Sequence, residues 1–71
     1  MGRLSKEEQF RLLYEAYSKE IYQYVFIRTG LEVTRAEDIT QDIFLEVFRS
    51  LERFKGLCSE RTWIFKLTKI R

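Results

Sequence analysis

The sequence contains no histidine and no proline, only one cysteine, and three widely spaced glycines. Without histidine the chain lacks the most common metal ligand and the usual general base near neutral pH. Because Cys58 is the only cysteine, neither a disulfide framework nor a thiolate metal site can form within the chain. These absences argue against an enzyme, and they predict a protein that binds no metal and no other cofactor.

Long apolar runs are also missing. No segment approaches the ~18 apolar residues needed to cross a membrane. Glu7 and Glu8 stand near the start, where a secretory signal would have its apolar segment. We therefore expect a cytoplasmic protein with no membrane partner.

The length of 71 residues allows one domain, 1–71. A domain of this size buries only about 60% of the surface that its unfolded chain exposes. The hydrophobic fraction of 45% and the charged fraction of 34% are typical of a folded domain. Six phenylalanines, four tyrosines and one tryptophan supply the large buried areas that a small core needs. We expect a marginal core that is further stabilised by a partner.

Positive charge is concentrated at the C-terminal end. The formal net charge is +2, but residues 58–71 carry four basic residues against one acidic residue, whereas residues 1–57 carry nine against ten. This bias favours contact with an anionic partner, nucleic acid first of all. It is also compatible with a solvated helix end whose basic residues complement the macrodipole.

The pattern of apolar residues predicts an all-α, compact three-helix domain, with helices at about 6–29, 35–55 and 59–71. The first two helices begin with capping-box patterns, Ser5 to Glu8 and Thr34 to Glu37, and are followed by Gly30 and Gly56. The third is expected to start at Ser59 and to be cut off by the chain end.

Each predicted helix has an apolar stripe, and the three stripes should bury one another. The first stripe comprises Phe10, Leu13, Tyr14, Tyr17, Ile21, Tyr24 and Val25; the second comprises Ala36, Ile39, Ile43, Phe44, Val47, Phe48, Leu51 and Phe54; the third comprises Trp63, Ile64, Leu67 and Ile70.

The polar side of the second predicted helix is unusual. Asp38, Gln41, Asp42, Leu45 and Arg49 fall within an arc of about 100° when helical positions are spaced by 100° per residue. Leu45 lies near the centre of this arc. A single exposed leucine often has no function. A leucine surrounded by carboxylates and an amide, however, resembles an interaction hot spot with a charged rim.

Three stretches together resemble region 2 of the extracytoplasmic-function (ECF) sigma factors of bacteria. They are Ala36-Glu37-Asp38-Ile39-Thr40-Gln41-Asp42-Ile43-Phe44-Leu45, then Phe54-Lys55-Gly56, then Thr62-Trp63-Ile64-Phe65-Lys66-Leu67. The resemblance extends from about Phe10 to Arg71. The combination of the acidic helix pattern with a Thr-Trp pair about twenty residues later is what makes it specific.

The resemblance implies that the exposed face of the second helix binds the paired clamp helices of the largest subunit of RNA polymerase. Asp38, Gln41 and Asp42 occupy the matching positions, and Leu45 and Arg49 extend the same face. The two aspartates could pair with arginines of that coiled coil.

The resemblance also implies contact with single-stranded DNA of the −10 promoter element. Such a site needs cations for the strand and aromatic surfaces for unstacked bases. The candidates are Phe54, Lys55, Arg61, Phe65, Lys66 and Lys69. Trp63 is assigned to the core instead.

Two features depart from the family pattern. Ile70 stands where family members carry an asparagine that helps to read a flipped base, so the resemblance does not carry base readout over to this position. The second helical domain that reads the −35 element is also missing. The chain is therefore either an excised domain or a stand-alone subunit that works with a separate −35-reading sigma subunit.

Two further hypotheses remain beside the transcription initiation factor. One is a helical adaptor that binds only protein, either polymerase or an anti-sigma factor, without useful DNA contact. The other is a three-helix DNA reader of the homeodomain type. The latter is disfavoured because its recognition helix would be strongly basic, whereas the longest patterned helix here is acidic outside.

Overall fold

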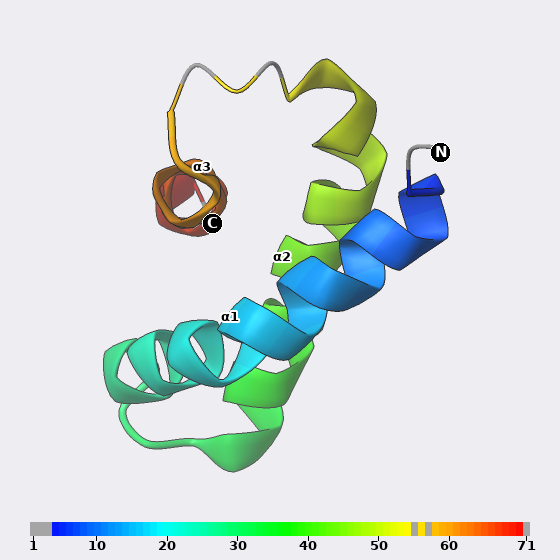
Figure 1. Ribbon diagram of the computed structural model, residues 1–71. Helices are drawn as coiled ribbons and strands as arrows, with labels where there is room; N and C mark the ends of the chain where they lie inside the picture. Colours follow the sequence, from blue (N-terminus) through cyan, green and yellow to red (C-terminus); the bar gives the residue numbers. More distant parts are fainter. Residues whose placement is uncertain (1–3, 55, 57, 71) are drawn as a thin grey trace.

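The computed structural model describes residues 4–54, 56 and 58–70, with the side chain of Ile70 left out. It contains α1 (Lys6–Arg28), α2 (Val33–Ser50), a short 3-10 helix η1 (Leu51–Arg53) and α3 (Glu60–Ile70) (Figure 1). Within these residues there is no strand. The predicted all-α domain of three helices is confirmed.

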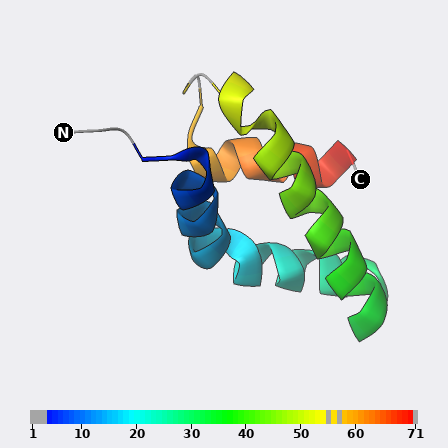
Figure 2. The same ribbon diagram turned by 90° about the vertical axis from the view of Figure 1, so that its right-hand side faces the viewer.

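The two long helices form a pair to which the third is added. α1 and α2 leave the turn that joins them and cross in Figure 1, where α3 lies to one side of this pair. Phe10 near the start of α1 meets Phe48 near the end of α2, with ring centroids 5.3 Å apart, so the two helices are still in contact at the ends far from the turn. In the view turned by 90°, α3 runs across the pair (Figure 2). This arrangement leaves α2 with one side against its neighbours and the other side facing outward.

The start of α1 is the capping box that the sequence predicts. The Ser5 hydroxyl accepts a hydrogen bond from the Glu8 backbone N–H at 3.2 Å, and the Glu8 carboxylate accepts one from the Ser5 N–H at 2.9 Å. Two amides that the helix itself cannot pair are thereby satisfied.

The end of α1 is a Schellman turn. The Leu31 N–H donates to the Phe26 carbonyl at 2.9 Å, and the Gly30 N–H donates to the Ile27 carbonyl at 3.3 Å. Gly30 has a φ of +76°, which a residue without Cβ adopts readily. Gly30 therefore ends the first helix, as predicted.

The start of α2 differs from the prediction. The helix begins at Val33, two residues before the expected position, and its N-cap is Glu32, which makes no side-chain capping bond. The capping box predicted for Thr34 and Glu37 is therefore wrong. The Ala36 N–H already donates to the Glu32 carbonyl at 3.0 Å, so Thr34 lies inside the first turn.

The end of α2 also differs. The α-helix ends at Ser50 and tightens into the 3-10 turn Leu51–Arg53 instead of continuing to residue 55. Gly56, which we expected to close the helix, has a left-handed φ of +73° but lies beyond that turn. The tighter turn changes the angular position of the residues after Ser50. The spacing of 100° per residue therefore places side chains around α2 correctly only up to Arg49.

The start of α3 agrees with the prediction. The Ser59 hydroxyl accepts a hydrogen bond from the Thr62 backbone N–H at 3.1 Å, which makes Ser59 the N-cap. The helix then runs from Glu60 to Ile70, and Arg71 lies outside the described residues.

The core takes β-branched side chains from all three helices. Ile21 of α1, Ile43 and Val47 of α2 and Ile64 of α3 have no exposed surface. Burying side chains of this size contributes roughly 1.5–3 kcal/mol each. Tyr14, predicted to lie inside, is instead 46% exposed. None of the described helices has the length and apolar character to cross a membrane.

Candidate functional site

The five residues predicted for polymerase binding all lie on the exposed side of α2. Leu45 is 55% exposed and so does not pack within the core of this domain. Its neighbours on this face are Asp38, Gln41, Asp42 and Arg49. We call these five residues the α2 face.

The opposite side of the same helix explains this exposure. Ile43, Phe44 and Val47 are buried, with exposed fractions of at most 2%. Their burial fixes the rotation of α2 about its axis, because a helix that buries one stripe must turn the opposite stripe outward. Leu45 is thus held outward by the packing of its neighbours in sequence.

The charged side chains of the α2 face are available for ion pairs with a binding partner. In the part of the chain that the structure describes, Asp38, Asp42 and Arg49 form no ion pair. An exposed apolar side chain with unpaired carboxylates around it suits a partner that carries basic groups beside an apolar surface. Binding through this face stays a prediction.

The residues predicted to contact DNA do not form one continuous surface. Phe54 is half-buried and stacks on Trp63, with ring centroids 4.6 Å apart and an interplanar angle of 25°. Phe54 is therefore engaged within the domain, and Trp63 packs against the core as predicted. Lys55 lies outside the described residues.

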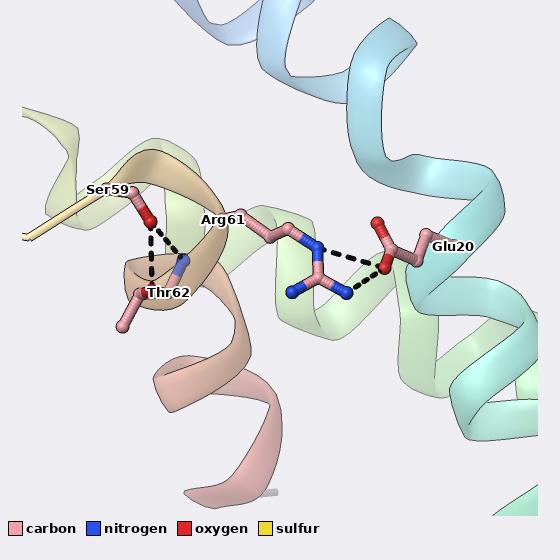
Figure 3. A network of polar contacts seen from close by, with 4 residues as sticks. All are labelled: Glu20, Ser59, Arg61 and Thr62. Carbon is pink, nitrogen blue, oxygen red and sulfur yellow. Dashed lines mark hydrogen bonds and ion pairs between the residues drawn. The ribbon is translucent and has the colours of Figure 1, made fainter.

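On α3, Lys66 and Lys69 are exposed, and neither forms an ion pair with a described residue. Arg61, in contrast, reaches from the first turn of α3 to Glu20 of α1 (Figure 3). The Arg61 Nε and Nη2 groups both donate to one oxygen of Glu20, the former at 3.0 Å. The hydrogen bond to Glu20 and the charge of its carboxylate raise the pKa of Arg61 above its ordinary value.

Phe65 contacts both Arg61 and a side chain of α1. Its ring meets that of Tyr24 edge to face, with centroids 5.5 Å apart and an angle of 88°. The Arg61 guanidinium lies 4.9 Å from the Phe65 ring centre. The predicted cation and the predicted aromatic residue are therefore in direct contact.

Sequence reasoning missed the contribution of α1. A groove between α1 and α3 has Glu20, Gln23 and Tyr24 on its α1 side. Of these three residues, the sequence pattern assigned a role only to Tyr24, as a member of the first apolar stripe. The pairing of Arg61 with Glu20 spans 41 residues, and no spacing rule within a single helix could have indicated it.

Comparison with known proteins identifies the family of the chain. Residues 13–70 match the family described as sigma-70 region 2. The chain is 33% identical over 63 residues to the ECF RNA polymerase sigma factor SigX of Bacillus subtilis, covering 89% of this chain and 32% of that protein. It is 38% identical over 55 residues to the RNA polymerase sigma factor YlaC of the same species, covering 78% of this chain and 31% of that protein.

A third relative is the ECF RNA polymerase sigma factor BldN of Streptomyces coelicolor, 38% identical over 53 residues, with 75% of this chain and 20% of that protein covered. The chain thus spans about a third of the length of these curated relatives, or less. No solved structure shows a significant match. The resemblance to region 2 of ECF sigma factors is confirmed, and the chain belongs to the sigma-70 region 2 family.

Proposed function

We propose that this domain serves in transcription initiation by binding RNA polymerase through the α2 face and promoter DNA through α3. The protein partner is the pair of clamp helices of the largest subunit. The DNA partner is the single-stranded −10 region. The domain acts as a binding module in the cytoplasm and has no catalytic role of its own.

One observation carries the polymerase part of the proposal. Leu45 is 55% exposed at the centre of a face whose carboxylates form no ion pair with any described residue, within the segment that matches the family. Leaving a leucine exposed contributes nothing to the stability of this domain. Its burial against a partner would supply the apolar centre of an interface, and Asp38 and Asp42 would steer basic groups toward the rim.

The test is a pull-down of core RNA polymerase with three forms of the domain. A Leu45→Ala, Gln41→Ala double variant should bind polymerase more weakly by ~1–3 kcal/mol, because it removes the apolar centre and an adjacent amide. Leu12→Ala is the matched control, since Leu12 is an exposed leucine of α1 with an exposed fraction of 47%. Equal retention of polymerase by the double variant and the parent would reject the proposed interface.

The DNA part of the proposal rests on Lys66 and Lys69, the two α3 cations for which the described part of the chain offers no ion-pair partner. Replacing Lys66 and Lys69 by glutamate should leave polymerase binding unchanged and should weaken binding to single-stranded promoter DNA. The parent's affinity for DNA should also fall steeply with salt, because each phosphate contact releases counterions. If the charge reversal abolished polymerase binding instead, the proposed separation of the two surfaces would be wrong.

A second candidate function is a protein-only adaptor, which binds polymerase or an anti-sigma factor without specific DNA contact. Two observations favour it. Phe54 is stacked on Trp63, and Arg61 is paired with Glu20. Two of the residues predicted to contact DNA therefore contact other residues of this domain instead. For such an adaptor, affinity for single-stranded DNA would be low at every salt concentration, and polymerase binding would be retained.

A further inference from the structure

The groove between α1 and α3 is the feature that the proposed function leaves unexplained. Its volume is about 640 Å³. α1 contributes four lining residues and α3 contributes five: Glu20, Gln23, Tyr24, Ile27, Arg61, Thr62, Phe65, Lys66 and Lys69. Most of the α3 residues were predicted to contact DNA, whereas none of the α1 residues was.

The middle of this groove is aromatic. Phe65 is half-buried, and Tyr24 supports it edge to face at a centroid distance of 5.5 Å. Because Tyr24 and the Arg61 guanidinium both contact the Phe65 ring, its orientation is fixed by two neighbours. The Arg61 guanidinium lies over the ring, so an unstacked base can pack only against the part of the ring that Arg61 and Tyr24 leave uncovered.

The charge of the groove is positive. Three cations and a single acid line it, and that acid, Glu20, is already paired with Arg61. Lys66 and Lys69 have no acidic partner among the described residues. The ligand that best satisfies such a groove is anionic and carries a flat, partly apolar ring.

Gln23 is the one amide among the lining residues. It is exposed and makes no side-chain hydrogen bond to any residue that the structure describes. The nearby Thr62 hydroxyl, by comparison, already accepts a hydrogen bond from Ser59 at 2.9 Å. A free amide offers a donor and an acceptor together, and glutamine uses both when it binds the edge of an adenine.

We infer that this groove binds one nucleotide of single-stranded DNA, with its base beside Phe65 and its edge read by Gln23. The inference rests on the proposed function, because it assumes that α3 meets a single strand. It adds a specificity-determining residue on α1 to a surface otherwise assigned to α3. Lys66 and Lys69 then bind the adjacent phosphates and contribute affinity without selectivity.

The experiment measures the affinity of the 71-residue chain for short fluorescent single-stranded oligonucleotides of equal length. The oligonucleotides differ at one position at a time, with each of the four bases in turn. At one position we expect the parent to prefer one base, and Gln23→Ala should reduce that preference by about tenfold. Gln9→Ala is the matched control, since it removes the same amide from the first turn of α1, outside the groove, and should leave the preference unchanged.

A second variant separates selectivity from general attraction. Lys66→Gln should lower affinity for all oligonucleotides alike and reduce the salt dependence by about one counterion, with the base preference retained. If Gln23→Ala lowered affinity equally for every oligonucleotide, or left the preference intact, the inference would be overturned while DNA binding by α3 stood.

Two other outcomes would also decide the matter. Competition by a polyglutamate peptide as strong as that by an oligonucleotide of equal charge would show a general anion surface, and would overturn the role of Gln23. Absence of any oligonucleotide binding, with polymerase binding intact, would overturn both this inference and the DNA part of the proposed function. The failure of the inference alone is therefore distinguishable from that of the proposal beneath it.

Discussion

Arg61 shows how the neighbours of a residue determine what its charge can do. In the sequence it is one of four basic residues after Cys58 and a natural phosphate contact. In the structure its guanidinium is held by Glu20 and packed against Phe65. A phosphate that approaches Arg61 must therefore compete with a carboxylate that is already in place.

This competition gives a prediction for Glu20→Gln. Removing the carboxylate charge frees Arg61 for a phosphate, so affinity for single-stranded DNA should rise about twofold to fivefold, as expected for one exposed charge. Fluorescence anisotropy at a fixed salt concentration measures the change. Glu15→Gln, an exposed position of α1 outside the groove, is the control. Weaker binding by Glu20→Gln would mean that Glu20 instead positions Arg61 for DNA.

The outward position of Leu45 could be predicted from the sequence, whereas the environment of Phe54 and Phe65 could not. Spacing within one helix divides its residues into faces, and the burial of Ile43 and Val47 then turns Leu45 outward. The partners of Phe54 and Phe65 come from other helices, at Trp63 and Tyr24. Their pairing depends on how the helices cross, and the pattern along one helix contains no information about that crossing.

At the scale of the element, the start of α2 also depends on residues outside the local pattern. The pattern from Thr34 to Glu37 is what a capping box requires, yet the helix starts at Val33. The physical reason lies in the preceding turn, where Gly30 and Leu31 both have positive φ, at 76° and 68°. Two left-handed residues in succession reverse the chain early, so Thr34 is already inside the helix.

A better N-cap residue should therefore stabilise α2. Glu32 has extended backbone angles suited to a cap but makes no side-chain capping bond. Glu32→Ser should stabilise the domain by about 0.5–1 kcal/mol, because serine can accept from the unpaired amides of the first turn. Thr34→Ala should cost little, as Thr34 is not the cap. Urea unfolding measures both, and a loss of ~1 kcal/mol for Thr34→Ala would show that Thr34 caps the helix after all.

The capping box at the start of α1 predicts that the stability of the folded domain depends on pH. Backbone and side-chain hydrogen bonds with Ser5 lower the pKa of Glu8 below its usual 4.5. A carboxyl whose pKa is lower in the folded state adds stability above its unfolded pKa, and this stability is lost as pH falls through the folded value. The advantage of the parent over Glu8→Gln should thus be full near pH 7 and should shrink below pH 4.5.

Thermal unfolding of the parent and Glu8→Gln across this range measures the difference. The side-chain oxygen of glutamine can still accept from the Ser5 amide, but glutamine does not titrate. The pH dependence of stability that comes from the other acidic residues is the same in both proteins, so the comparison removes it. A difference between the two proteins that did not change with pH would contradict the role assigned to the ionised Glu8.

At the scale of the whole molecule, a small core positions two separate surfaces. Ile21, Ile43 and Ile64 bring one buried side chain from each helix into the same cluster. The α2 face lies on one helix, whereas the groove lies between α1 and α3. The two surfaces share no residue, so a variant of one should leave the other intact, and the polymerase and DNA parts of the account can be tested apart.

The fold class and the family could be inferred from the sequence, because apolar periodicity and the acidic α2 pattern are local properties. The groove could not, because it exists only where α3 packs beside α1. This difference explains why every predicted polymerase contact lies on a single face, whereas the predicted DNA contacts are divided between internal stacking and the groove.

The most direct test of the central claim is the position of the α2 face on assembled polymerase. A photoreactive side chain in place of Arg49, at the rim of that face, should crosslink to the clamp helices of the largest subunit when the domain binds core RNA polymerase. The same group in place of Lys66, on α3, should not. Crosslinks to the clamp helices from position 66 with none from position 49 would contradict the account.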